Sequence, residues 1–187
     1  MSKDMTIADW VKQADPEPCG DAMEWAESEG MTMMSEAWDG VVEHWYRRGY
    51  TSWLSWLIYY AATANEQRHL FMELAKLKTR GGDRTILDII RDSYKDTDVL
   101  GFLRDGDYVD TEPAFEAAAA ASQYHLLRPA VSPIWSESVA WMSMVLLSPA
   151  AGLIDLQSAL MAVSSLYVGD DDDDIDIIII KHNPFRD

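Results

Sequence analysis

Hydrophobic residues recur every three or four positions along most of this chain, which is the periodicity of helices that bury one face. In the first half, the pattern predicts helices over residues 6–13, 20–28, 32–47 and 52–78. In the second half it predicts helices over residues 84–95, 98–104 and 112–127, and two more that begin at Ser132 and Ser148. Because the alternation typical of strands is scarce, we expect an all-α protein. Its architecture should be a single helical bundle-like domain of about seven to nine helices.

Prolines and glycines divide the expected helices. The stretch Asp15–Pro18 contains two prolines, which remove backbone donors and restrict the residues before them. Gly30 and Gly49 suit the C-terminal ends of helices. The step Arg80–Asp83 holds two glycines and is a candidate subdomain boundary near 80–83. One acidic helical domain over residues 1–169 is the simpler organisation.

The last segment, residues 170–187, has a different composition. Five consecutive aspartates, Asp170–Asp174, precede four consecutive isoleucines, Ile177–Ile180. The β-branched side chains favour a strand, and an exposed run of them would promote aggregation. We therefore expect this short acidic and isoleucine-rich tail to be buried, either in its own domain or against a second copy of the chain. The aspartates would keep the neighbouring isoleucines soluble.

Acidic residues are strongly in excess, and they are concentrated in blocks. The 187 residues include 32 Asp and Glu against 15 Lys and Arg, which gives a formal net charge of −17. Residues 1–46 carry −9, residues 47–82 carry +4, residues 83–116 carry −6, residues 117–169 carry −1 and the tail carries −5. Such a charge disfavours direct binding to nucleic acid or to anionic lipid. The blocks are either interaction surfaces or the solvated faces of amphipathic helices.

The chain contains one cysteine and no long apolar segment. Cys19 has no partner within the chain for a disulfide, and a structural zinc site built on cysteines is excluded. The apolar stretches Trp53–Ala62 and Trp141–Leu147 are far shorter than the roughly 20 residues that span a bilayer. These features are typical of a protein of the reducing cytoplasm, so we expect localisation in the cytoplasm and no membrane partner.

Motifs for catalysis or for metal binding are weak. Asp105, Asp107 and Glu116 have the outer spacing of an EF-hand, but Val109 and Asp110 occupy positions five and six, where that loop needs an oxygen ligand and a glycine. Glu66 and His69 match only half of a di-iron site. We find no nucleophile elbow and no glycine-rich phosphate loop. We therefore expect no catalytic residues, no metal, no cofactor and no enzymatic activity, with a metal-dependent enzyme as a distant third alternative.

One pattern in the first third resembles a known group of proteins. It consists of Asp21-Ala22-x-x-Trp25, Thr32, Glu36-Ala37-Trp38, Arg48-Gly49 and Trp53-x-x-Trp56-Leu57. This pattern resembles a family of small, Trp-rich helical proteins of phages and actinobacteria, and more distantly a family of toxin-immunity proteins. The family usually places Arg-Gly-Asp directly before the two tryptophans, whereas Tyr50-Thr51-Ser52 intervenes here. Because Trp53 and Trp56 lie three apart, we expect them to pack in the core.

The acidic blocks and the resemblance together suggest an inhibitor. Carboxylates on a rigid helical surface can occupy a basic groove that otherwise binds DNA or RNA. The resemblance to phage proteins implies a target in host defence, as for an anti-CRISPR or anti-restriction protein. The expected contact residues are the following acids: Glu24, Glu27, Glu29, Asp39, Glu43, Asp88, Asp92, Asp96, Asp98, Asp105, Asp107, Asp110, Glu112, Asp170, Asp171, Asp172, Asp173 and Asp174.

Two alternatives use the same features differently. A toxin-neutralising immunity protein would present its acids to a basic toxin by the same physics. A structural phage protein would instead form a helical oligomer, for example a homodimer in which the isoleucines of the tail exchange between subunits. In each case the partner is a protein, and nucleic acid is not bound directly.

Overall fold

The described part of the protein is helical. The computed structural model describes residues 5–15, 17–47, 49–78, 85–88, 141–143, 145–146, 151–167 and 172–186. Within these ranges, the regular elements are helices, accompanied by two isolated β-bridges, Thr6 with Met33 and Lys78 with Thr85. The expectation of an all-α protein is therefore confirmed. In this part of the chain, no helix combines the length and the apolar character needed to cross a membrane.

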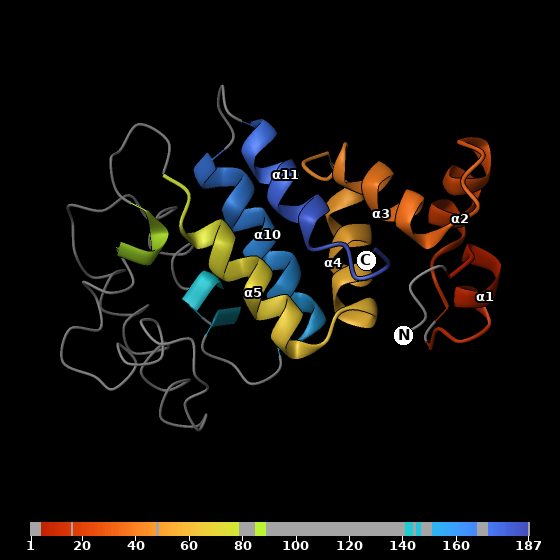
Figure 1. The fold of residues 1–187 in the computed structure, drawn as a ribbon, viewed down its shortest axis with the longest axis horizontal. Helices are drawn as coiled ribbons and strands as arrows, with labels where there is room; N and C mark the ends of the chain where they lie inside the picture. The colour runs from red at the N-terminus through yellow and green to blue at the C-terminus, as the bar shows by residue number, and fades with distance from the viewer. Residues whose placement is uncertain are drawn as a thin grey trace.

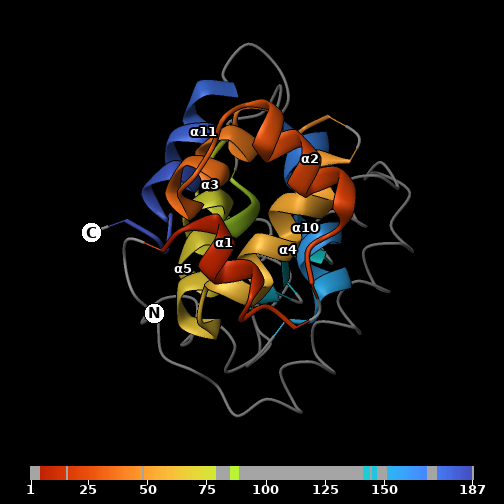
Figure 2. The same cartoon turned by 90° about the vertical axis from the view of Figure 1, so that its right-hand side faces the viewer.

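Seven helices are labelled in Figure 1: α1 (Ile7–Val11), α2 (Gly20–Ser28), α3 (Met34–Val42), α4 (Tyr50–Ala61), α5 (Ala64–Ala75), α10 (Leu153–Tyr167) and α11 (Asp172–Lys181). Helix α10 packs along α4, and α3 packs against α4, α1 and α11. Helix α11 also packs against α5. Helices α1 and α2 lie together at one end of the molecule, which faces the viewer in Figure 2.

Local signals place the first two helices where the sequence predicts them. The Thr6 hydroxyl accepts a hydrogen bond from the backbone N–H of Asp9 at 3.1 Å and caps α1. Helix α2 runs from Gly20 to Ser28, and Gly30 follows it with a φ of 70°, a conformation that glycine adopts at low cost. Gly49, at a φ of 100°, makes the turn that leads into α4.

The prediction of a single helix over residues 52–78 is wrong. The chain breaks at Ala62 and Thr63, because Thr63 and Glu66 form a reciprocal capping box that begins α5. The Thr63 N–H donates to the Glu66 carboxylate at 2.6 Å. The buried amide of Gln67 donates to the Ala62 carbonyl at 3.0 Å. It thereby supplies a hydrogen bond to a carbonyl at the C-terminal end of α4, where carbonyls lack partners within the helix. The helix expected through residue 47 also ends earlier, at Val42.

The prediction that the tail isoleucines form a strand is also wrong. Residues Asp172–Lys181 form the α-helix α11. Its period places Ile175 and Ile179 on one face, where they are 1% and 0% exposed, while Ile177 is 47% exposed. Phe185 follows the helix and is 2% exposed. The tail therefore packs into the same core as α3 and α5.

The tryptophans fall into two groups. Trp10, Trp38 and Trp45 are buried in the core. Trp53 and Trp56, expected there from their spacing, are only partly buried and pack against its edge, as Trp25 does. The helices expected over 98–104 and 112–127 lie outside the described residues.

Candidate functional site

Among the residues whose exposure the structure describes, the largest run of exposed acid surrounds α2. Its members are Asp15, Glu17, Asp21, Glu24, Glu27 and Glu29, which we call the α2 acidic surface. All six side chains are exposed to solvent. The sequence contains no lysine or arginine between Lys12 and Arg47, so no basic residue of this segment offsets them. The result is a helix with strongly negative charge at one end of the molecule (Figure 2).

Aromatic packing holds α2 in place. The Trp25 ring lies 5.4 Å from the ring of Tyr50 and 5.6 Å from that of Trp53, both on α4. Gly40 on α3 leaves room for this contact, because a Cβ atom there would lie 3.1 Å from the Trp25 ring and would collide with Met31. The α2 acidic surface is therefore carried by a helix fixed to α3 and α4 through one indole.

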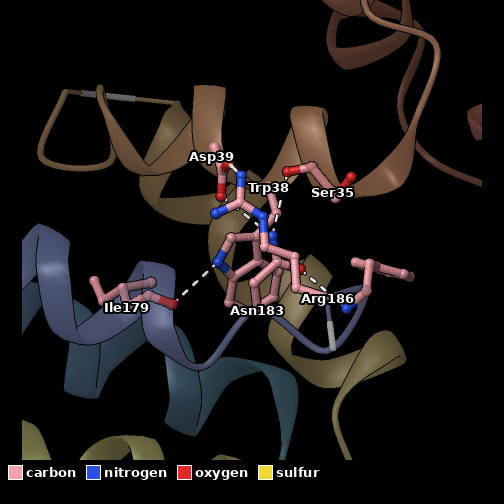
Figure 3. Close-up of polar contacts among 7 residues, drawn as sticks. Ser35, Trp38, Asp39, Ile179, Asn183 and Arg186 are labelled. Atoms are coloured by element: carbon pink, nitrogen blue, oxygen red, sulfur yellow. Dashed lines mark hydrogen bonds and ion pairs between the residues drawn. The ribbon is translucent and has the colours of Figure 1, made fainter. Parts of the chain in front are cut away.

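Asp39, expected at the partner surface, takes part in polar contacts within the molecule, between α3 and the C-terminal segment (Figure 3). We call this group, which consists of Ser35, Asp39, Asn183 and Arg186, the clasp. Its carboxylate accepts a hydrogen bond from the Asn183 amide at 3.2 Å and forms an ion pair with Arg186. The same amide donates to the Ser35 carbonyl at 3.2 Å. Burial raises the pKa of Asp39, and the contacts with Asn183 and Arg186 offset part of this effect.

Two buried indoles strengthen the contact between α3 and α11. The Trp38 N–H donates to the Ile179 carbonyl at 3.1 Å (Figure 3), and the Trp45 N–H donates to the Asp176 carboxylate at 2.9 Å. Asp176 thus has a structural role in the acidic tail. The sequence carries no local signal for these bonds, since the partners lie far apart in the chain.

The remaining expected contact residues differ in their exposure and in their contacts. Glu43 and Asp174 are exposed, and Asp172 and Asp173 begin α11. Asp88 is half-buried and accepts a hydrogen bond from the Thr85 hydroxyl at 2.8 Å, so it stabilises a helix start. The other acids lie outside the described residues: Asp92, Asp96, Asp98, Asp105, Asp107, Asp110, Glu112, Asp170 and Asp171.

The described residues contain no group of three or more His, Cys, Asp or Glu side chains placed to hold a metal ion. Glu66 is committed to the capping box, and His69 is exposed. The loop that resembles an EF-hand, residues 105–116, lies outside the described residues. Cys19 is an exposed free thiol.

A cavity lies beneath α2, which the sequence does not predict. It has a volume of about 400 Å³ and is lined by residues of α1, α2, α3, α4 and α10. Four indoles border it, those of Trp10, Trp25, Trp53 and Trp56. Trp25, Trp53 and Trp56 are only partly buried, in agreement with their position at the border of this cavity.

Comparison with known proteins adds no assignment. No protein-family model matches the chain, and no curated protein or solved structure shows significant similarity to it. The resemblance at Asp21–Leu57 therefore stays a prediction.

Proposed function

We propose that this protein is a non-enzymatic inhibitor whose α2 acidic surface binds the basic, nucleic-acid-binding surface of another protein. One observation carries the proposal: six exposed carboxylates occur within residues 15–29, in a stretch without any lysine or arginine. The target class that we infer is a host defence protein, of the kind blocked by anti-CRISPR or anti-restriction proteins. The inhibitor would compete with DNA or RNA for that surface.

The spacing of the acids supports this proposal. Asp21, Glu24 and Glu27 follow one another at three-residue intervals on α2. Since a helix rises 1.5 Å per residue, successive carboxylates are separated by about 4.5 Å along its axis. The phosphates of one DNA strand lie ~3.4 Å apart. A short row of carboxylates on α2 therefore approximates the linear charge density of a single strand.

The availability of these carboxylates supports it further. Within the described part of the chain, Glu24, Glu27 and Glu29 take part in no hydrogen bond or ion pair through their side chains. Asp9, Glu36 and Asp39 in the same acidic block are bonded to caps or to the C-terminal segment. A partner that binds the α2 acidic surface would not have to break an existing contact.

The experiment begins by finding the partner. The full chain is immobilised and used to capture proteins from a nuclease-treated bacterial lysate, and mass spectrometry identifies them. The affinity of the purified partner is then measured by calorimetry at about 50 mM and about 500 mM salt, between which the Debye length falls several-fold. We expect at least ~10-fold weaker binding at the higher salt concentration, because the interface is electrostatic.

Competition with nucleic acid distinguishes this function from its alternatives. Duplex DNA or RNA that binds the partner should displace the chain in proportion to its own affinity. An affinity that does not change with salt, or a ternary complex in which chain and nucleic acid bind undiminished, would contradict the proposal. Capture of a toxin that does not bind nucleic acid would instead identify an immunity protein.

A further inference from the structure

The cavity beneath α2 has the size of a small-molecule site. Its volume of about 400 Å³ falls within the range of about 300–1,000 Å³ that is typical of ligand pockets. Five helices contribute to its walls, and Leu153 and Gln157 are the residues of α10 among the lining. Sites built on helices hold their geometry better than sites built on loops.

Aromatic side chains dominate the walls. The four bordering indoles belong to three different helices, since Trp10 lies on α1, Trp25 on α2, and Trp53 and Trp56 on α4. The Trp10 and Trp56 rings meet edge to face at 6.2 Å, and those of Trp25 and Trp53 lie 5.6 Å apart. Indoles bind apolar groups by burial and bind cations through the negative potential of the ring face.

The walls carry both acceptors and donors of hydrogen bonds, and the buried Nε1–H of Trp10 has no hydrogen-bond partner within the described part of the chain. The Ser52 hydroxyl donates its hydrogen to the Gly49 carbonyl at 2.5 Å, and the Ser55 hydroxyl donates to the Ser52 carbonyl at 2.9 Å. Both oxygens keep lone pairs, but their hydrogens are already used. Glu17 is the only charged residue among the described residues that line the cavity. The charge that a ligand would meet at these walls is therefore negative.

We propose that this cavity binds an organic cation that has an apolar body and a terminal ammonium group. The apolar body would occupy the space between the indoles, and the ammonium group would contact Glu17 and the aromatic rings. Neutral molecules of the same shape lack the charge attraction, and carboxylates would be repelled by Glu17. Glu17 also belongs to the α2 acidic surface, but the test of this binding requires no protein partner, so the two proposals can fail independently.

The test uses three probes of similar shape: phenethylammonium, phenethyl alcohol and hydrocinnamate. Each is titrated into the full chain and followed by calorimetry and tryptophan fluorescence. We expect saturable binding of the ammonium compound, about three- to tenfold weaker binding of the alcohol, and the weakest binding for the carboxylate. Equal affinity for the ammonium compound and the alcohol, or no saturable binding of the ammonium compound, would overturn the proposal.

Three variants place the binding in the cavity. Glu17→Gln should lower the affinity for phenethylammonium to that for the alcohol. Glu43→Gln removes the same charge from an exposed residue of the α3 end and should leave both affinities unchanged. Ala22→Phe adds a ring to the lining and should abolish binding.

Because Glu17 is exposed, we expect the Glu17→Gln variant to fold. Circular dichroism checks each variant, and the ammonium-to-alcohol ratio in Glu17→Gln decides the question even if Ala22→Phe fails to fold. An unchanged ratio in Glu17→Gln would overturn the assignment of the cation to this cavity.

Discussion

Helices α2 and α11 are both acidic, yet they relate to the core in opposite ways. Helix α11 buries Ile175 and Ile179 almost completely between α3 and α5, and buried indoles bond to its backbone and to Asp176. In α2, Ala26 is the buried residue, Trp25 is partly buried, and a cavity lies beneath it. The comparison shows that acidic charge does not decide whether a helix is structural. The two helices differ instead in how completely their apolar side chains are buried in the core.

Truncation of Ile179 should produce the largest effect. Because its side chain is fully buried, Ile179→Ala should lower the free energy of unfolding by about 2–5 kcal/mol. Ile177→Ala is the matched control on the same helix and should cost less than about 1 kcal/mol, since its side chain is 47% exposed. Urea denaturation followed by circular dichroism measures both. Equal losses would mean that α11 does not dock through this face.

Replacement of single indoles compares the two helices directly. Trp38→Phe removes the N–H that donates to the Ile179 carbonyl and should cost about 0.5–1.5 kcal/mol, the net value of one hydrogen bond, because this carbonyl still accepts from the His182 N–H at 3.2 Å. Trp25→Phe changes a partly buried ring beside the cavity and should cost less. The same denaturation experiment ranks the two variants, and the reverse order would contradict the account of how α11 and α2 are attached.

The clasp of the C-terminal segment should appear in the pH dependence of stability. Burial raises the pKa of Asp39 above its ordinary 3.8, so the folded state binds this proton more tightly than the unfolded state does. The contribution of Asp39 to stability therefore rises as the pH falls through its folded-state pKa. Backbone hydrogen bonds from Thr32 and Met33 lower the pKa of Glu36 below its ordinary 4.5. Its contribution is therefore present above 4.5 and is lost as the pH falls through its folded-state pKa.

Asp39→Asn and Glu36→Gln separate these two effects. The unfolding free energy is measured from about pH 6 to about pH 3, where both groups titrate. Relative to each variant, the wild-type protein should gain stability toward low pH in the first comparison and lose it in the second. Parallel curves for Asp39→Asn and the wild type would show that burial does not raise the pKa of Asp39 in the folded state.

Removal of charge from α2 should have the smallest effect on stability. Glu24 and Glu27 are exposed, so the double substitution Glu24→Gln and Glu27→Gln should change the free energy of unfolding by less than about 0.5 kcal/mol. Thermal denaturation measures this change. A loss as large as that for Trp38→Phe would mean that these acids hold the fold together, and the contrast with α11 would disappear.

Local signals in the sequence were sufficient for part of the fold. The ends of α2 follow from Gly20 and Gly30, and the start of α1 follows from Thr6. The break between α4 and α5 was also readable, because Thr63 and Glu66 have the spacing of a capping box. The expectation of one long helix gave more weight to apolar periodicity than to this cap.

Long-range packing accounts for what the sequence could not show. The β propensity of the tail isoleucines is overridden by their burial against α3 and α5, as tertiary context commonly overrides propensity. Nothing in the local sequence distinguishes Asp39 from a surface acid, because its partner Arg186 lies 147 residues later in the chain. The cavity depends on how closely five helices approach, and no local pattern records that distance.

Under the proposed function, the α2 acidic surface binds the basic partner, and the overall negative charge does not. The most direct measurement compares two double variants of equal net charge for affinity to the captured partner at about 50 mM salt. One is Glu24→Gln with Glu27→Gln on α2, and the other is Glu43→Gln with Asp174→Asn on α3 and α11, all four acids being exposed. We predict about tenfold or greater weakening for the α2 pair and less than about twofold for the other pair. Equal weakening of the two variants would contradict the claim.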